Sequence, residues 1–376
     1  MLDVKSIIKH FLWLFLITLI IGGLFVIFKD FSFAILILKF FVFPGAVFIF
    51  LGSLFIDWYD RKLFALMQDR VGPPFLQPLY DLLKLLVKED ITPDGADKIE
   101  FDAIPPIQMI LALLVAFIVP VYSIEGLISF EGDIIFILFL TIMIGACIFL
   151  LGWTSNSPYS MIGGSRAALA EISFGIPLAL AFIGPAILSG SLSLSTMILS
   201  DYNLVNLPLN VIRGDFELVK IFYLLPLVIL FVLALLSVTA VLEKVPFDPA
   251  HAEVEIVGGW NVELSGKKLL FTRFANLILE FALAGIMVAI FLGGPRFPLI
   301  DISGIWIIGN WDVLVYLLNI ATFIVKMLIV VFFITFIRSV QSRVRIDQLI
   351  HYFWYYFLPL AFVALFMIII FLGVGI

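Results

Sequence analysis

The sequence predicts an all-α integral membrane protein, a polytopic helical bundle of about nine transmembrane helices with an amphipathic surface helix. Hydrophobic residues make up 63% of the 376 residues and charged residues only 13%, and the mean hydropathy is +1.20. Such a composition cannot cover a soluble globule with polar surface. Apolar runs recur along the chain, and each is long enough to cross the hydrocarbon core of a bilayer. We therefore expect one membrane domain over residues 1–376.

Nine apolar runs give the predicted spans. They cover residues 11–28, 39–57, 105–122, 133–153, 167–188, 220–242, 269–292, 313–338 and 349–374. The run 11–28 follows two lysines, but it is long for a signal peptide and lacks a small-residue cleavage site, so we expect a retained helix. It precedes a core over residues 39–374.

The distribution of positive charge predicts the orientation. If the N-terminus is cytoplasmic, nine alternating spans place most of the 22 basic residues on the cytoplasmic side, in agreement with the positive-inside rule. The cytoplasmic loops are then 58–104, 154–166, 243–268 and 338–348. Residues 75–88 in the first loop carry leucines at helical spacing (Leu79, Leu82, Leu83 and Leu86, followed by Val87), with Asp81, Lys84 and Lys88 on the other side. We expect an amphipathic helix there.

Composition also excludes several function classes. A net charge of −6 argues against nucleic acid as a partner. Cys147 is the only cysteine, and one thiol cannot hold an iron–sulfur cluster or form an internal disulfide, so any redox centre must belong to another chain. The chain has no phosphate-binding glycine loop, and its three histidines lack metal-ligand spacing. We identify no catalytic site and no cofactor of its own.

Residues 243–268 form the most polar segment between two apolar runs. The segment contains five acids, three lysines and one histidine, and Glu253, Glu255 and Glu263 lie near the Gly258–Gly259 pair. A solvated loop is the simpler interpretation of such a charge run. A functional interpretation gains weight from its position on the same side as the other polar loops.

Three ionisable residues lie within predicted spans, where burial of a charge is costly. They are Glu171, Glu280 and Lys326. One interpretation is structural, with Lys326 paired to Glu280 as a clamp between helices. The other is a path of proton-exchanging groups that starts at the acids of residues 243–268 and continues inward.

Four motifs in the cytoplasmic segments resemble those of the H subunit of respiratory complex I and of its relatives in energy-converting membrane-bound hydrogenases. Together they cover the chain from about residue 55 to its end. The first contains Asp60, Arg61, Lys62, residues 68–73, Gln77, Pro78, Asp81, Lys84, Lys88 and Glu89, and the second is residues 159–173. The third contains residues 246–248, Glu253, Glu255, Gly259, Glu263 and residues 265–266, and the fourth contains Arg338, residues 343–345 and 347–349, Trp354 and residues 358–359. The family usually has eight spans, so residues 11–28 look like an added helix.

The resemblance implies a role in a prokaryotic cell-membrane complex. The protein would anchor hydrogenase-like large and small subunits, which hold iron–sulfur clusters and in some relatives a nickel–iron centre, to antiporter-like membrane subunits. Glu253, Glu255, Glu263 and Asp248 would be acids of a funnel, and Glu171, Glu280 and Lys326 candidates for the membrane axis. The interface to the redox arm would comprise Arg61, Lys62, Arg70, Asp81, Lys84, Lys88, Glu89, Arg166, Lys244, His251, Arg273, Arg338, Arg343, Arg345 and Asp347.

Departures from the quinone-reducing members favour one branch of the family. Those enzymes have Ser-Tyr-Glu where this chain has Ser173-Phe174-Gly175, and a glutamine where it has Glu171. They also have a glutamate at His251, an arginine at Lys244, a tyrosine at Leu264 and a tendency to glutamate at Arg273. The loss of acids around a quinone chamber favours a ferredoxin-oxidising complex that reduces protons or sulfur species.

Three alternatives remain open. A quinone-reducing complex I protein is the second interpretation within the family. A stand-alone secondary transporter would show inverted repeats, which the two halves of the sequence do not display. The third alternative is a structural anchor without an ion path.

Overall fold

The computed structural model describes residues 37–200, 202–208, 222–296 and 312–374. Within these residues, eight helices are long and apolar enough to cross a membrane. This confirms the predicted all-helical polytopic class. The predicted span 11–28 lies outside the described residues, and the single-domain organisation of residues 1–376 stays a prediction.

The described chain is a series of long helices joined by short helical segments. The long helices are α3 (Ala46–Met67), α5 (Lys98–Ile118), α6 (Asp133–Thr154), α7 (Pro158–Ser189), α10 (Leu224–Val241), α12 (Gly266–Phe291), α13 (Asp312–Val340) and α15 (Leu358–Val374). The short ones are α4 (Gln77–Val87), α8 (Leu194–Leu199), α11 (Glu253–Ile256), α14 (Ile346–His351), the 3₁₀ turns Pro249–His251 and Gly259–Asn261, and the π-helical segment Tyr352–Phe357. The π-helical segment joins α14 and α15 into one span, Ile346–Gly373.

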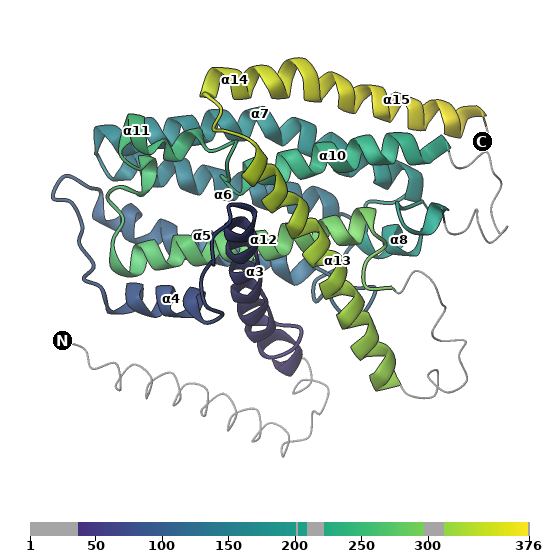
Figure 1. Ribbon diagram of the computed structural model, residues 1–376, viewed down its shortest axis with the longest axis horizontal. Coiled ribbons are helices and arrows are strands. Elements are labelled where there is room, and N and C mark those ends of the chain that lie inside the picture. Colours follow the sequence, from purple (N-terminus) through teal and green to yellow (C-terminus); the bar gives the residue numbers. More distant parts are fainter. Residues whose placement is uncertain (1–36, 201, 209–221, 297–311, 375–376) are drawn as a thin grey trace.

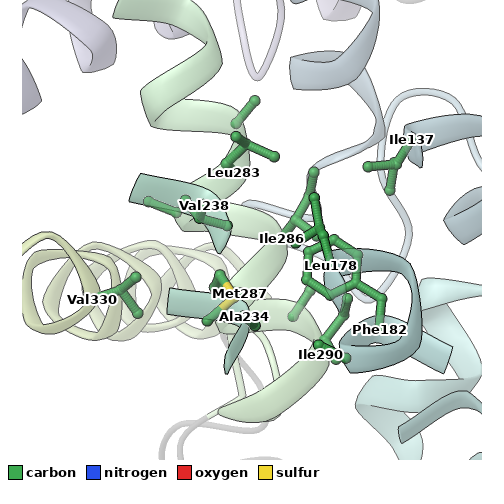
Figure 2. Close-up of a cluster of buried hydrophobic side chains, with 14 of the residues drawn as sticks. Ile137, Leu178, Phe182, Ala234, Val238, Leu283, Ile286, Met287, Ile290 and Val330 are labelled. Atoms are coloured by element: carbon green, nitrogen blue, oxygen red, sulfur yellow. The ribbon is translucent and has the colours of Figure 1, made fainter. Parts of the chain in front are cut away.

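Helix α12 is the centre of the bundle. In Figure 1, α5, α6, α7, α10, α12 and α15 run roughly side by side, whereas α3 and α13 cross them at a steep angle. In the most apolar 18 residues of α12, 83% of the residues are buried inside the protein. The corresponding share is 22% for the span that contains α3. Figure 2 shows the core that results, in which Leu283, Ile286, Met287 and Ile290 of α12 meet side chains from α6, α7, α10 and α13.

Several helices extend further toward the predicted cytoplasmic side than the sequence indicates. Helix α3 continues to Met67 instead of ending at Asp57, and α7 begins at Pro158, so much of the predicted loops 58–104 and 154–166 is helical. Helix α5 begins at Lys98, before Pro105 and Pro106, and α12 begins at Gly266. A span predicted from hydropathy ends at the first charged residues. The helix itself can continue beyond them when those charged side chains form ion pairs or hydrogen bonds within the protein.

The predicted amphipathic helix is present as α4, although its buried face differs in detail. Pro78, Leu82 and Leu85 are buried, whereas Leu83 and Val87 are exposed. Leu82 and Leu85 pack with Leu270 of α12. Helix α4 thus packs on α12, and the buried face of α4 contains fewer of its apolar residues than the sequence predicted.

Residues 243–268 are not a solvated loop, because several of their side chains belong to the core. Trp260 is 1% exposed, and Ala250 and Leu264 are also buried. They pack with Phe101 of α5 and Leu151 of α6. Below we call residues 243–268 the junction segment.

Gly163 allows the junction segment to lie directly on α7. A Cβ atom at Gly163 would meet the backbone nitrogen of Trp260 at 2.5 Å and the Cα of Gly259 at 2.6 Å. Gly152 and Gly164 make a similar close approach between α6 and α7. The Gly163–Gly164 pair therefore serves close packing.

We expect Gly163→Ala to destabilise the protein by about 1–3 kcal/mol, because the added methyl group collides with backbone that cannot move aside easily. The midpoint of thermal unfolding in detergent measures this loss. Gly175→Ala on the same helix is the matched control, since a Cβ there meets nothing within 4 Å. Equal stability of the two variants would contradict the packing account.

Candidate functional site

A buried charge network joins the junction segment to α3, α12 and α13. We define the network as Asp60, Lys244, Glu280 and Arg338. The Lys244 ammonium lies 3.0 Å from Asp60 Oδ2 and 2.5 Å from Glu280 Oε1. Asp60 is 2% exposed and Glu280 4%. One lysine thus bridges two carboxylates that water cannot solvate. Lys244 lies three residues beyond Val241, where α10 ends.

Helix α13 completes the network. Arg338 Nη1 donates to Asp60 Oδ2 at 2.8 Å, and the Thr335 hydroxyl donates to Asp60 Oδ1 at 2.6 Å. The network therefore contains two carboxylates and two cations, so its net charge is zero. Burial opposes the charge of Lys244, but Asp60 and Glu280 more than offset it and raise the pKa of that ammonium.

Two further ion pairs lie between this network and the surface beside α4. Asp57 lies one turn before Asp60 on α3 and pairs with Arg61 at 2.9 Å, and Arg61 reaches Asp81 of α4 at 2.7 Å. Partial burial disfavours the Asp81 carboxylate, but hydrogen bonds from Arg61 and Gln77 hold its pKa below the usual value. Charged side chains therefore follow one another from the half-exposed Asp81 of α4 to Glu280 in the middle of α12.

A second cluster lies on the other side of the α10 terminus, around Glu243. Its carboxylate contacts His251 Nε2 at 2.9 Å and accepts a hydrogen bond from Trp260 Nε1 at 3.2 Å. Glu243 and Lys244 are adjacent in the chain, and Glu243 has φ 48°, in the left-handed region. This conformation directs the two side chains into different clusters.

Asp248 is buried beside this cluster. Arg343 Nη2 lies 3.3 Å from its Oδ2, and its Oδ1 is buried without a partner among the described residues. Burial raises the pKa of Asp248 to about 6, partly opposed by His251 and Arg343. A carboxyl group with this pKa exchanges protons near neutral pH.

The predicted funnel acids do not share one environment. Glu255 is exposed and pairs with Arg166 at 2.6 Å. Glu263 is half-buried, and the side chain of Glu253 lies outside the described residues. Of the four predicted acids, only Asp248 is buried within the described structure.

The predicted axis residues are also separated. The carboxyl group of Glu171 lies against Gly145 of α6. The carboxylate of Glu243 is close enough to interact with it electrostatically. Lys326 donates to the carbonyl oxygens of Leu292, Gly294 and Arg296, each at 2.8 Å, at the end of α12. The predicted clamp between Lys326 and Glu280 is therefore wrong, because Glu280 is paired with Lys244 instead.

The residues predicted to contact a redox arm fall into two groups. Arg70, Lys84, Lys88, Glu89, Arg273, Arg345 and Asp347 are exposed. Lys62, whose ammonium donates to the carbonyl of Val71, is half-buried. The remaining residues are engaged in the ion pairs above: Arg61, Asp81, Arg166, Lys244, His251, Arg338 and Arg343. Their contact with another chain stays a prediction.

Three important acids were absent from the predicted site. Asp57, Asp60 and Glu243 lay at predicted helix ends, where a charge normally marks the membrane boundary. The spacing of Asp57, Asp60 and Arg61 at one helical turn was the available signal, because it continues α3 beyond its apolar part. Among the described residues, no group of three His, Cys, Asp or Glu side chains could hold a metal ion.

We expect Lys244→Met to lower stability by about 3–5 kcal/mol, because it leaves two carboxylates buried without their shared partner. The unfolding midpoint in detergent measures the loss, and Lys244→Arg should retain most of the stability. Lys267→Met removes an exposed lysine of the same segment and serves as the control. The network assignment fails if both methionine variants unfold alike.

Comparison with known proteins agrees with the resemblance drawn from the four motifs. Residues 38–369 match the NADH dehydrogenase family. The H subunit of the NADH-quinone oxidoreductase of Dehalococcoides mccartyi is 31% identical over 320 residues, which cover 84% of this chain and 81% of the relative. The corresponding protein of Bacillus cytotoxicus is 32% identical, covering 82% and 86%. A chain of the membrane-bound sulfane sulfur reductase, an archaeal respiratory membrane complex, has the same fold, with a TM-score of 0.70 and 24% identity over 86% of this chain and 96% of that chain.

Proposed function

The chain belongs to the NADH dehydrogenase family, together with the H subunits of bacterial NADH-quinone oxidoreductases, and from this premise we propose that it is a membrane component of a complex I-related respiratory complex. It anchors a peripheral redox arm at the cytoplasmic ends of its helices. It also carries part of the path along which electron transfer drives proton or sodium movement in neighbouring antiporter-like subunits.

The buried charge network is the observation that carries this proposal. Lys244 belongs to the junction segment, and its ammonium bridges Asp60 of α3 and Glu280 of α12. A displacement or a change of charge in the junction segment must therefore alter the environment of a carboxylate in the middle of the bundle. At short distance in a medium of low dielectric constant, such a change alters interaction energies by several kcal/mol. This is sufficient to move a proton between groups.

We place the redox chemistry in partner subunits that hold iron–sulfur clusters. The complex lies in the cell membrane of a prokaryote, with the junction segment and the ends of α3, α7 and α13 on the cytoplasmic side. Figure 1 supports a common side, since α4, α11 and α14 lie in the same half of the bundle, away from α8.

A ferredoxin-oxidising arm that reduces protons or sulfur species is the favoured partner. His251 and Lys244 stand where the quinone-reducing members have glutamate and arginine, and both side chains are built into ion pairs here. The positive charge of His251 replaces a negative one in the segment that would face a quinone chamber.

A quinone-reducing complex is the second candidate, because the curated relatives carry the name NADH-quinone oxidoreductase. Mass spectrometry of the intact complex distinguishes the two by the partner subunits. Quinone reduction that a quinone-site inhibitor abolishes would favour the second candidate and overturn the first.

In the assembled complex, Glu280→Gln should lower ion translocation about tenfold or more at unchanged electron transfer and assembly, because the amide cannot exchange a proton. Ion uptake into proteoliposomes, divided by electrons transferred, measures this coupling. Glu255→Gln tests the surface end of the path in the same assay.

Glu125→Gln, at an exposed site on the opposite side of the bundle, is the control and should behave as wild type. If Glu280→Gln moves as many ions per electron as the wild type, the protein is a structural anchor without an ion path. Ion transport by the purified chain alone would instead indicate a secondary transporter.

A further inference from the structure

The two ring nitrogens of His251 both face hydrogen-bond acceptors. Nε2 lies 2.9 Å from Glu243 Oε2, and Nδ1 lies 3.4 Å from the carbonyl oxygen of Gly258. A neutral imidazole carries one proton and can donate to only one of them, whereas an imidazolium donates to both. The geometry therefore matches the charged form of His251.

Asn261 is the third polar neighbour of the ring. Its Nδ2 lies 3.5 Å from His251 Nδ1, at the outer limit of a hydrogen bond, so this amide contributes little to holding the ring.

The charges around His251 favour the imidazolium. Acids outnumber bases near the ring, and the charged groups that face it or its segment are Glu243, Asp248, Glu255, Glu171, Arg343 and Arg166. Burial opposes the charge on His251, but Glu243 and Asp248 more than offset it and raise its pKa to about 9.

We propose that His251 is a positioning residue whose imidazolium fixes Glu243 against Trp260 and thereby holds the adjacent Lys244 in the buried charge network. This rests on the proposed function, because the network is the path through which the junction segment acts on Glu280. The ring also lies on Trp260, with centroids 5.4 Å apart, so three side chains of the segment are fixed together. The junction segment thus contains a set of contacts whose strength depends on the protonation of one histidine.

The sign of the pH dependence follows from the raised pKa of His251. Its contribution is fully present below the ordinary histidine pKa of about 6.5 and is lost as pH rises through about 9. Coupling should therefore be constant near neutral pH and decline with a midpoint near pH 9. Asp248 of the same segment, whose pKa is raised to about 6, titrates well below that range.

The test measures ions moved per electron in proteoliposomes of the intact complex, from about pH 6 to about pH 10. We expect His251→Gln to show low coupling at every pH without the decline near pH 9. His251→Lys keeps a cation and should retain coupling beyond the wild-type midpoint. His351→Gln, an exposed histidine of α14 that stacks on Tyr355, is the matched control and should follow the wild-type profile.

A wild-type pH profile in His251→Gln overturns the inference. The proposed function still stands in that case if Glu280→Gln, measured in parallel, lowers the number of ions moved per electron. If no variant and no wild-type complex moves ions, the proposed function itself is wrong and the inference falls with it. A purely structural role would lower the yield of His251→Gln and His251→Lys alike and would leave the midpoint of the pH profile unchanged in the surviving protein.

Discussion

Lys244 holds Asp60 and Glu280 together in a region where water cannot screen their charges. Each carboxylate there needs a cation, and each cation needs an acid, so the three helices and the junction segment that supply them cannot separate without exposing an unpaired charge. The inclined paths of α3 and α13 across α12 are what bring Asp60, Arg338 and Glu280 to one point. The mechanical role of the junction segment depends on this arrangement, because Lys244 is the only member of the network that the segment supplies.

Much of the fold could be predicted from the sequence because its signals are local. Apolar runs give the spans, leucine spacing gives α4, and the polar content of residues 243–268 marks them as distinct from an ordinary turn. The burial of this segment was less accessible. Trp260 and Leu264 are the apolar anchors that seat it on α5 and α6, but among so many apolar residues they carry no separate signal.

The site itself was only partly predictable, because pairing depends on helix crossing, which hydropathy does not encode. Glu280 was identified from its position inside a span, but its partner was not, and Lys326 instead satisfies the carbonyl groups at the end of α12. Asp60 and Glu243 lie just beyond the ends of the predicted spans, where a sequence pattern cannot distinguish an exposed acid from a buried one. His251 was visible as a substituted position, whereas its bond to Glu243 required the left-handed turn at that residue.

Infrared difference spectroscopy of the assembled complex tests the central claim most directly, namely that electron transfer in the partner subunits changes the protonation or hydrogen bonding of the buried network. Spectra of the reduced minus the oxidised complex, with and without Glu280→Gln, isolate the carboxyl group of Glu280. The account predicts a carboxyl or carboxylate band that appears on reduction and is absent in the variant. Identical difference spectra from the two proteins would contradict it.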